Sequence, residues 1–119
     1  MVVTGIYPHR GDIYLVNFDP TVGSEIQKTR PALIIQNDLA NRYSPIVIVA
    51  GITSKFQDPL YPTEVLIKAS AGGLKNDSVV LLNQIRSIDK QRLIRKIGGI
   101  STEERQQIDR AIQISLGLV

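Results

Sequence analysis

Cysteine is absent from the 119-residue chain, and histidine occurs once, at His9. Without cysteine, disulfide frameworks and thiolate metal sites are excluded. With one histidine, which precedes the first expected strand, no histidine pair shares acid and base duties and a Ser–His–acid triad is disfavoured. The sequence also has no GxGxxG or Walker pattern and no carboxylate–histidine cluster with metal-ligand spacing. These absences leave a site built from Arg, Thr, Ser and Glu, without a metal.

Long apolar runs are also absent, since none approaches the roughly 18 residues that cross a bilayer. Gly5 and Pro8 interrupt the first residues, so we expect no signal peptide and a cytoplasmic location. Hydrophobic residues make up 43% of the chain and charged residues 21%, which is typical of a globular protein. We therefore expect one domain over residues 1–119. The net charge of +3 is compatible with a polyanionic partner.

Apolar and β-branched runs predict a set of short strands. The expected strands cover residues 12–18, 32–36, 46–52, 64–68 and a long strand that opens at 79–82. Pro31 is expected at the start of the second strand, and Gly51 is expected to mark a bulge in the third. Asn37 offers a cap for a short helical turn at 39–43, and residues 71–77 are typical of a turn.

The last element has the clearest pattern, that of an amphipathic helix. Ser101 followed by Glu104 is a capping box, and Gly117 is a C-terminal stop. One apolar stripe is expected from residues Ile108, Ala111, Ile112, Ser115 and Leu116. Gly98 and Gly99 are expected to break the chain between the basic run 90–96 and this helix. Together these elements predict an α+β fold, a small barrel-like antiparallel sheet with a C-terminal helix. The open edges of this sheet favour a homodimer.

The polar loop at 18–31 joins the first two strands and concentrates the candidate chemistry, because functional groups tend to lie on loops held by strands. Arg30 at its far end offers a planar fork of donors that fits phosphate. Thr53, where the third strand ends, offers a hydroxyl to a phosphoryl oxygen. RNA carries its own nucleophile, the 2′-hydroxyl, so aimed donors of this kind suit RNA cleavage better than amide hydrolysis.

Several motifs in fixed order resemble the MazF/PemK-type toxins and cover most of the chain from Gly11 to Leu118. The motifs include Gly23-Ser24-Glu25, Thr29-Arg30-Pro31, Gln36-Asn37-Asp38, Ile52-Thr53, Asp77-Ser78-Val79 and Gln84-Ile85-Arg86. The resemblance implies an SH3-like, CcdB/PemK-type fold and a homodimer silenced by a cognate antitoxin. It also implies a metal-independent, sequence-specific endoribonuclease that cuts single-stranded mRNA, uses no cofactor, and leaves 2′,3′-cyclic phosphate and 5′-hydroxyl ends.

The resemblance further implies which residues form the site. The expected catalytic residues are Arg30, Thr53 and Glu25. The expected substrate-binding residues are Ser24, Asn37, Asn83, Gln84 and Arg86. The chain departs from the family pattern at 26–28 and at Asn83, where some relatives carry an acidic residue, and both departures bear on sequence specificity.

Plainer interpretations stand beside these assignments. Arg30 is also explained as a surface ion-pair partner of Glu25, and Glu25 either acts as a base or only orients Arg30. Thr53 is also an ordinary strand residue, Ser24 a turn former, and residues 83–86 a solvated strand face. Two other functions remain open: a non-catalytic CcdB-like inhibitor of DNA gyrase on the same scaffold, and a non-catalytic RNA-binding module. The basic run 90–96 is either a solvated face or an RNA track.

Overall fold

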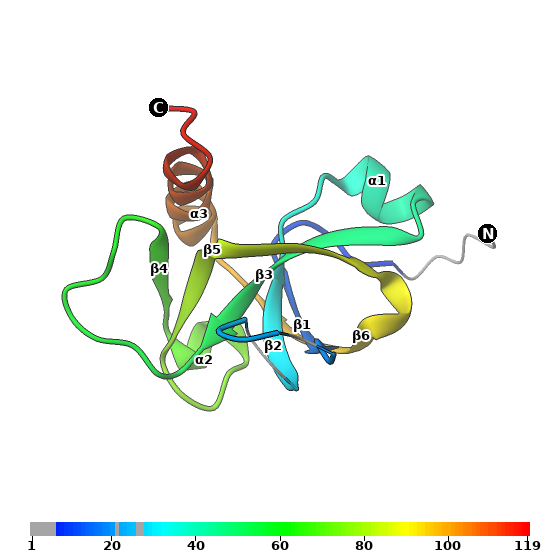
Figure 1. Cartoon of the computed structure of the whole chain (residues 1–119), viewed down its shortest axis with the longest axis horizontal. Coiled ribbons are helices and arrows are strands. Elements are labelled where there is room, and N and C mark those ends of the chain that lie inside the picture. Colours follow the sequence, from blue (N-terminus) through cyan, green and yellow to red (C-terminus); the bar gives the residue numbers. More distant parts are fainter. Residues whose placement is uncertain (1–6, 21, 26–27) are drawn as a thin grey trace.

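A computed structural model describes residues 7–20, 22–25 and 28–119, and over these residues the chain forms a six-stranded antiparallel sheet with a helix at one end (Figure 1). The elements follow one another as β1 (Asp12–Asn17), β2 (Thr29–Ile34), α1 (Asp38–Tyr43), β3 (Ile46–Thr53), β4 (Glu64–Ile67), α2 (Ala69–Gly72), β5 (Ser78–Asp89), a 3-10 turn (Lys90–Arg92), β6 (Leu93–Gly99) and α3 (Thr102–Ser115). The strand order β4-β5-β3-β2-β1-β6 leaves β4 and β6 as unpaired edges in the described residues. The α+β class with a C-terminal helix is confirmed, although "barrel-like" describes this open sheet only loosely.

Two apolar clusters hold the sheet, and both are rich in β-branched residues that pack well on a pleated surface. The first lies between the sheet and α3 and includes Ile13, Leu33, Ile52, Ile67, Leu82 and Ile108. The second lies on the opposite face of the sheet, because its residues alternate along β2 and β3 with those of the first, and it includes Val16, Phe18, Ile34, Val47, Val49 and Ile88. Each fully buried aliphatic side chain contributes about 1.5–3 kcal/mol relative to exposure.

Helix α3 begins as the sequence predicts. The Ser101 hydroxyl oxygen accepts the Glu104 amide at 3.1 Å, and the Ser101 amide donates to the Glu104 carboxylate at 2.9 Å. The Ser115 hydroxyl donates to the Leu82 carbonyl at 2.6 Å, which ties the helix to β5. Leu116 is 59% exposed, so the expected apolar stripe ends one residue early, while Gly117 at φ +71° ends the helix as expected.

Strand β2 begins at Thr29, three residues earlier than predicted, so Pro31 lies inside the strand. The ladder between β2 and β3 begins only at Ala32, and the missing N–H of proline therefore falls just outside it. The ladder between β3 and β5 shifts register between Ala50 and Gly51, which confirms the irregularity expected at Gly51.

Two elements differ from the sequence-based expectation. Helix α2 begins at Ala69, where no helix was expected, and the basic run continues into strand β6. The expected break at Gly98 and Gly99 is wrong, since both residues belong to β6. A Cβ atom at Gly98 would overlap the Gly72 carbonyl, so this glycine permits a close approach of two backbones.

The apolar helix needed to span a membrane does not occur among the described residues.

Candidate functional site

The register of β2 and β3 brings Arg30 and Thr53 together. Ala32 pairs with Gly51 and Leu33 with Ala50. Continuing the same register two residues beyond Ala32 and Gly51 places Arg30 opposite Thr53. Directly opposite residues of an antiparallel pair project from the same face, with Cβ atoms about 4.5–5.5 Å apart. The guanidinium and the hydroxyl therefore extend from one face at one end of the sheet.

Both side chains line a hollow of about 380 Å³. The residues around this charged hollow are Ser24, Glu25, Arg30, Ile52, Thr53, Lys55, Leu81 and Gln84. The structure thus places the three expected catalytic residues around one space large enough for a phosphate and its sugar. Arg30 is exposed and Thr53 is half-buried, so both are accessible to a ligand.

The hydroxyl of Thr53 is oriented by the turn that follows it. The Lys55 amide donates to Thr53 Oγ1 at 3.1 Å, and the Lys55 carbonyl oxygen lies 3.5 Å from the same atom. The Thr53 hydroxyl itself donates to the Lys55 carbonyl at the limit of hydrogen-bond distance. Because this bond is long, the hydroxyl proton can turn to a nearer acceptor without losing a strong contact.

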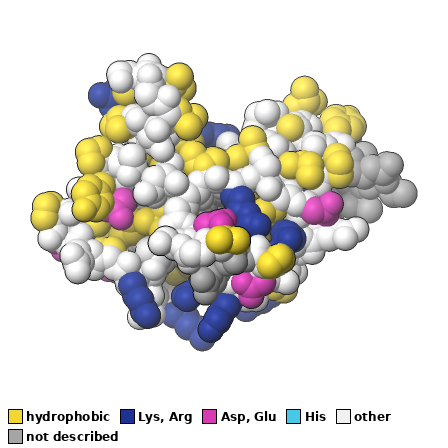
Figure 2. Space-filling model, viewed as in Figure 1, with side chains coloured by type: hydrophobic (Ala, Val, Ile, Leu, Met, Phe, Trp, Pro, Cys, Tyr) yellow, Lys and Arg dark blue, Asp and Glu magenta, His cyan; other side chains and the backbone are white. Residues whose placement is uncertain are grey.

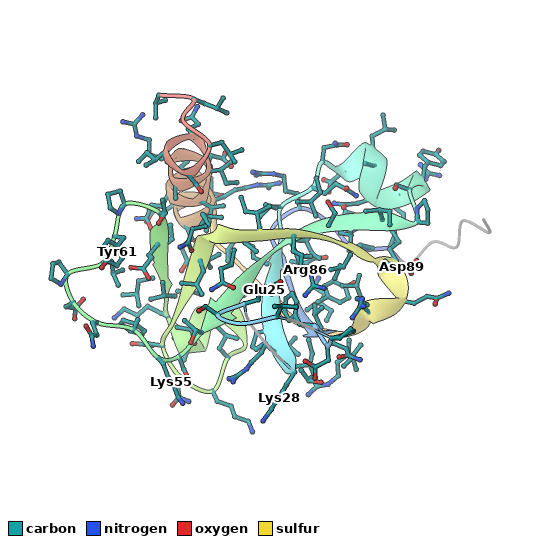
Figure 3. All side chains as sticks on the ribbon, in the orientation of Figure 1. Glu25, Lys28, Lys55, Tyr61, Arg86 and Asp89 are labelled. Atoms are coloured by element: carbon teal, nitrogen blue, oxygen red, sulfur yellow. The ribbon has the colours of Figure 1, made fainter. Side chains whose placement is uncertain are left out.

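Glu25 closes the loop on itself. Its Oε1 accepts the Val22 amide at 3.0 Å, and its own amide donates to the Val22 carbonyl at 3.3 Å. Ser24 lies inside this turn and lines the same hollow. Figure 3 shows Glu25 on the loop in front of the sheet, close to Arg86. The carboxylate therefore has a structural contact as well as a place in the candidate site.

Asn83 and Gln84 come from an irregularity in β5. Ala50 pairs with Ile85 but Gly51 pairs with Leu81, so residues 82–84 are extra to the ladder. Leu82 is buried and Asn83 is exposed, which directs one amide side chain outward. The two amides line a second space of about 390 Å³, the amide hollow, with Phe18, Ser24, Glu25, Gly51, Ile85 and Arg86. Ser24, Glu25 and Gln84 form the wall that the two hollows share.

Arg86 connects β5 to the beginning of the loop. Its Nη1 donates to the Phe18 carbonyl at 3.0 Å, and its guanidinium carbon lies 5.8 Å from the centroid of the Phe18 ring. Phe18 is 2% exposed and packs in the core. The structure thus gives Arg86 a contact that positions the loop, in addition to its place beside the amide hollow.

Asn37 stands apart from the other expected residues. Its Oδ1 accepts the Ala40 amide at 2.9 Å as the cap of α1, which confirms the predicted cap, and it lines neither hollow. Conversely, Lys55 lines the charged hollow although it was not among the site residues expected from the sequence. Lys55 lies in the turn after β3, so the alternation of strand residues gave no signal for its position.

Metal ligands are not grouped in the described part of the chain, where no three His, Cys, Asp or Glu residues lie close enough together to hold an ion. The chemistry offered by the two hollows is instead that of hydrogen-bond donors, fixed positive charge and one carboxylate. Such a site can neutralise a phosphoryl group and transfer protons.

Comparison with known proteins identifies the family. Residues 9–116 match the PemK-like, MazF-like toxins of type II toxin-antitoxin systems, and the chain belongs to this family. It is 51% identical over 110 residues to endoribonuclease EndoA of Bacillus subtilis (strain 168), which covers 92% of this chain and 95% of that protein. The resemblance inferred from the sequence motifs is therefore confirmed.

Solved structures agree with the fold. MazF (Form-I) from Deinococcus radiodurans superposes with a TM-score of 0.80 at 26% identity, covering 94% of this chain and 98% of that one. An endoribonuclease in complex with its cognate antitoxin, from Mycobacterial species, gives a TM-score of 0.79 at 24% identity, with coverage of 94% and 97%. The second likeness supports the fold alone.

Proposed function

We propose that this chain cleaves single-stranded mRNA at a short sequence without a metal ion or other cofactor, leaving a 2′,3′-cyclic phosphate and a 5′-hydroxyl. Its broader class, an endoribonuclease toxin of a toxin–antitoxin system, follows from the family match and from the 51% identity to EndoA. The finer chemistry rests on the lining of the charged hollow, in which fixed donors surround a space that accepts a phosphate.

The reaction requires one bond to form and one to break at phosphorus. The 2′-oxygen attacks phosphorus and loses its proton to a base, while the bond from phosphorus to the 5′-oxygen breaks and that oxygen takes up a proton. Arg30 binds the non-bridging oxygens with its positive charge. It gives a proton to the leaving 5′-oxygen, because an alkoxide is a stronger base than a neutral guanidine, and takes a proton back from solvent. Thr53 donates its hydroxyl to a non-bridging oxygen. Glu25 accepts the proton of the 2′-hydroxyl.

The amide hollow is assigned to base recognition. Asn83 and Gln84 each offer donors and an acceptor, the groups that distinguish one base edge from another in unpaired RNA. Ser24 lies on the shared wall and binds the sugar or phosphate between the two spaces. Arg86 holds the loop in front of the sheet and binds substrate at the edge of the amide hollow. Asn37 lies outside both hollows and its Oδ1 caps α1, so its contact with a base stays a prediction from the family resemblance.

We further propose that the protein acts in the cytoplasm as a homodimer and is silenced by a cognate antitoxin. Open edges on β4 and β6 and exposed apolar side chains such as Leu116 and Leu118 provide surface for a second copy or a partner. The solved complex of a structurally similar endoribonuclease with its antitoxin supports this fold as one that accepts such a partner.

The observation that carries the proposal is the meeting of Arg30, Thr53 and Glu25 around one hollow. The test is incubation with single-stranded RNA in EDTA, followed by analysis of the product ends. Wild type is expected to give cyclic phosphate and 5′-hydroxyl ends, and Arg30→Ala to stop cleavage while the protein stays folded. Cleavage by Arg30→Ala at the wild-type rate contradicts the mechanism. RNA that is bound but keeps its length indicates a binding module, and inhibition of DNA gyrase without RNA cleavage indicates the CcdB-like alternative.

A further inference from the structure

A third depression, the basic groove, lies between the turn after α2 and strand β6 and has a volume of about 660 Å³. Four cationic side chains line it: Arg30, Lys75, Arg95 and Lys96. Its described lining contains no Asp or Glu side chain. Figure 2 shows Lys and Arg side chains gathered along the lower edge of the molecule, the edge where Figure 3 places Lys28 and Lys55. This surface therefore attracts polyanions.

The basic groove adjoins the charged hollow. Arg30 and Ile52 line both spaces, and Ser54, the neighbour of Thr53, lines the groove. Thr53 lines only the charged hollow, whereas its strand-face opposites Leu15 and Pro31 line only the groove, so the two spaces lie on opposite faces of the sheet. A strand with its scissile phosphate between Arg30 and Thr53 reaches the groove by passing around the end of β2 at Arg30, which lines both spaces. The positive charge is thus placed where the next phosphates of the same polymer pass.

The structure divides the basic run 90–96 into two parts. Lys90 donates from Nζ to the Asn41 carbonyl, and Arg92 donates from Nη1 to the Asn17 carbonyl at 3.1 Å, so both are used inside the fold. Arg95 and Lys96 lie on β6 and line the groove instead. The alternatives of solvated face and RNA track are therefore left for Arg95 and Lys96, because Lys90 and Arg92 form contacts inside the fold.

Lys75 and Arg95 carry the charge of the groove that is not already neutralised. Lys96 Nζ lies 3.3 Å from the Asp12 carboxylate, which compensates part of its charge. Lys75 and Arg95 are exposed, and within the described residues neither forms an ion pair. These two side chains are available to a ligand at low cost.

The walls of the groove are held together by a close backbone contact. Gly73 adopts φ +74°, and a Cβ atom there would overlap the Ile97 carbonyl of β6. The segment after α2, which carries Lys75, and strand β6, which carries Arg95, are therefore held at a fixed distance from each other. A preformed groove of this kind binds an extended chain without first having to order itself.

We propose that the basic groove binds the phosphates of RNA flanking the cleavage site, with Lys75 and Arg95 as the contacts. This inference rests on the proposed function and extends it to a sequence-independent subsite. RNA is favoured over an acidic peptide because the groove continues from the phosphate position at Arg30, a residue common to both spaces. The subsite raises affinity for long RNA and leaves base selection to the amide hollow.

The test measures binding of a long, mixed-sequence 2′-O-methyl RNA, which resists cleavage, over a series of salt concentrations. The variant Lys75→Gln/Arg95→Gln is compared with wild type and with Arg105→Gln/Arg110→Gln, which removes the same charge from exposed positions on α3. The groove variant is expected to bind roughly tenfold more weakly at low salt, with a slope of log affinity against log salt that is shallower by about 1.4. The α3 variant is expected to match wild type.

A groove variant with the affinity and salt slope of the α3 variant overturns the subsite. If wild type still cleaves single-stranded RNA in EDTA, the proposed function stands even though the groove does not bind RNA. Wild type that neither cuts nor binds RNA overturns the proposed function itself. Loss of binding to a poly-glutamate peptide, with RNA binding unchanged, overturns the RNA assignment in favour of an acidic protein partner.

Discussion

The charged hollow and the amide hollow share one wall but are built in different ways. Arg30 and Thr53 lie near the ends of β2 and β3, where the register of the two strands, continued two residues past Ala32 and Gly51, places one side chain opposite the other. Asn83 and Gln84 lie within residues 82–84 of β5, which are extra to the ladder with β3. Reaction chemistry therefore depends on the regular part of the sheet and recognition on its irregular part. Substitutions in the two hollows should separate these properties.

After the complete loss expected for Arg30→Ala, the largest effect is expected from Glu25 on the shared wall. Glu25→Gln keeps an oxygen that accepts the Val22 amide but removes the base, so the cleavage rate should fall about 10³-fold on every RNA sequence. Single-turnover cleavage checks this value, and Glu25→Ala, which also loses the loop contact, is the comparison. A Gln variant as fast as wild type beside a slow Ala variant would assign Glu25 to loop positioning alone.

Thr53 is expected to have the next largest effect. Thr53→Val preserves shape and removes one aimed donor, so the rate should fall about 10²-fold. Thr53→Ser retains the hydroxyl held by the Lys55 amide and is expected to keep most of the activity. Because the charged hollow serves the reaction, the order of preference among RNA sequences should be the same in all three proteins. A change in that order would show that the charged hollow also contributes to base recognition.

The amide hollow should behave in the opposite way. Asn83→Ala removes a base contact, so discrimination between the preferred site and its single-base variants should fall about tenfold with a smaller effect on the rate at the best site. Sequencing of 5′-hydroxyl ends measures both quantities. Ser87→Ala, at an exposed position on the same strand, is the control and should leave the cleavage pattern unchanged. Equal loss at every site would show that Asn83 supports the reaction instead.

The contrast between regular and irregular parts of the sheet also explains which elements were predicted correctly from the sequence. The strands with buried runs and the capped helix α3 were found where expected, because burial and capping leave local signals. The register shift falls at Gly51 as expected, but the extra residues 82–84 lie on β5, opposite the strand in which the bulge was predicted. Strand β6 was missed since it is an edge strand whose exposed positions tolerate charge, and its partner β1 lies far away in the chain. The start of β2 at Thr29 was missed because its pairing with β1, rather than its composition, makes it a strand.

The candidate site shows the same limit. Arg30 and Thr53 carry local signals at strand ends, and their meeting follows from the strand order. The separation of Asn37 from the other residues does not follow from the sequence, because a helix cap and a base-contacting amide require the same residue type. Lys55 and the basic groove are products of tertiary packing, in which α2 and β6 meet through glycines.

The smallest effect is expected at α1, none of whose residues lines either hollow. The Asp38 carboxylate accepts the Arg10 amide at 2.6 Å, which holds the pKa of Asp38 below its usual value of 3.8 in the folded protein, with Asn41 adding a weaker hydrogen bond. A lowered pKa in the folded state means that this stabilisation is present above the unfolded pKa and is lost as the pH falls through the folded pKa.

Asp38→Asn should therefore unfold more easily at neutral pH and lose less stability on acidification than wild type. Urea unfolding between neutral pH and pH values below 3.8 measures both changes. Asp58→Asn, in the exposed loop before β4, is the control and should follow the wild-type curve. Cleavage by Asp38→Asn at neutral pH should equal that of wild type, because Asp38 lines neither hollow. If the free energy of unfolding fell equally with pH in Asp38→Asn and in wild type, the contact with the Arg10 amide would not be a source of stability.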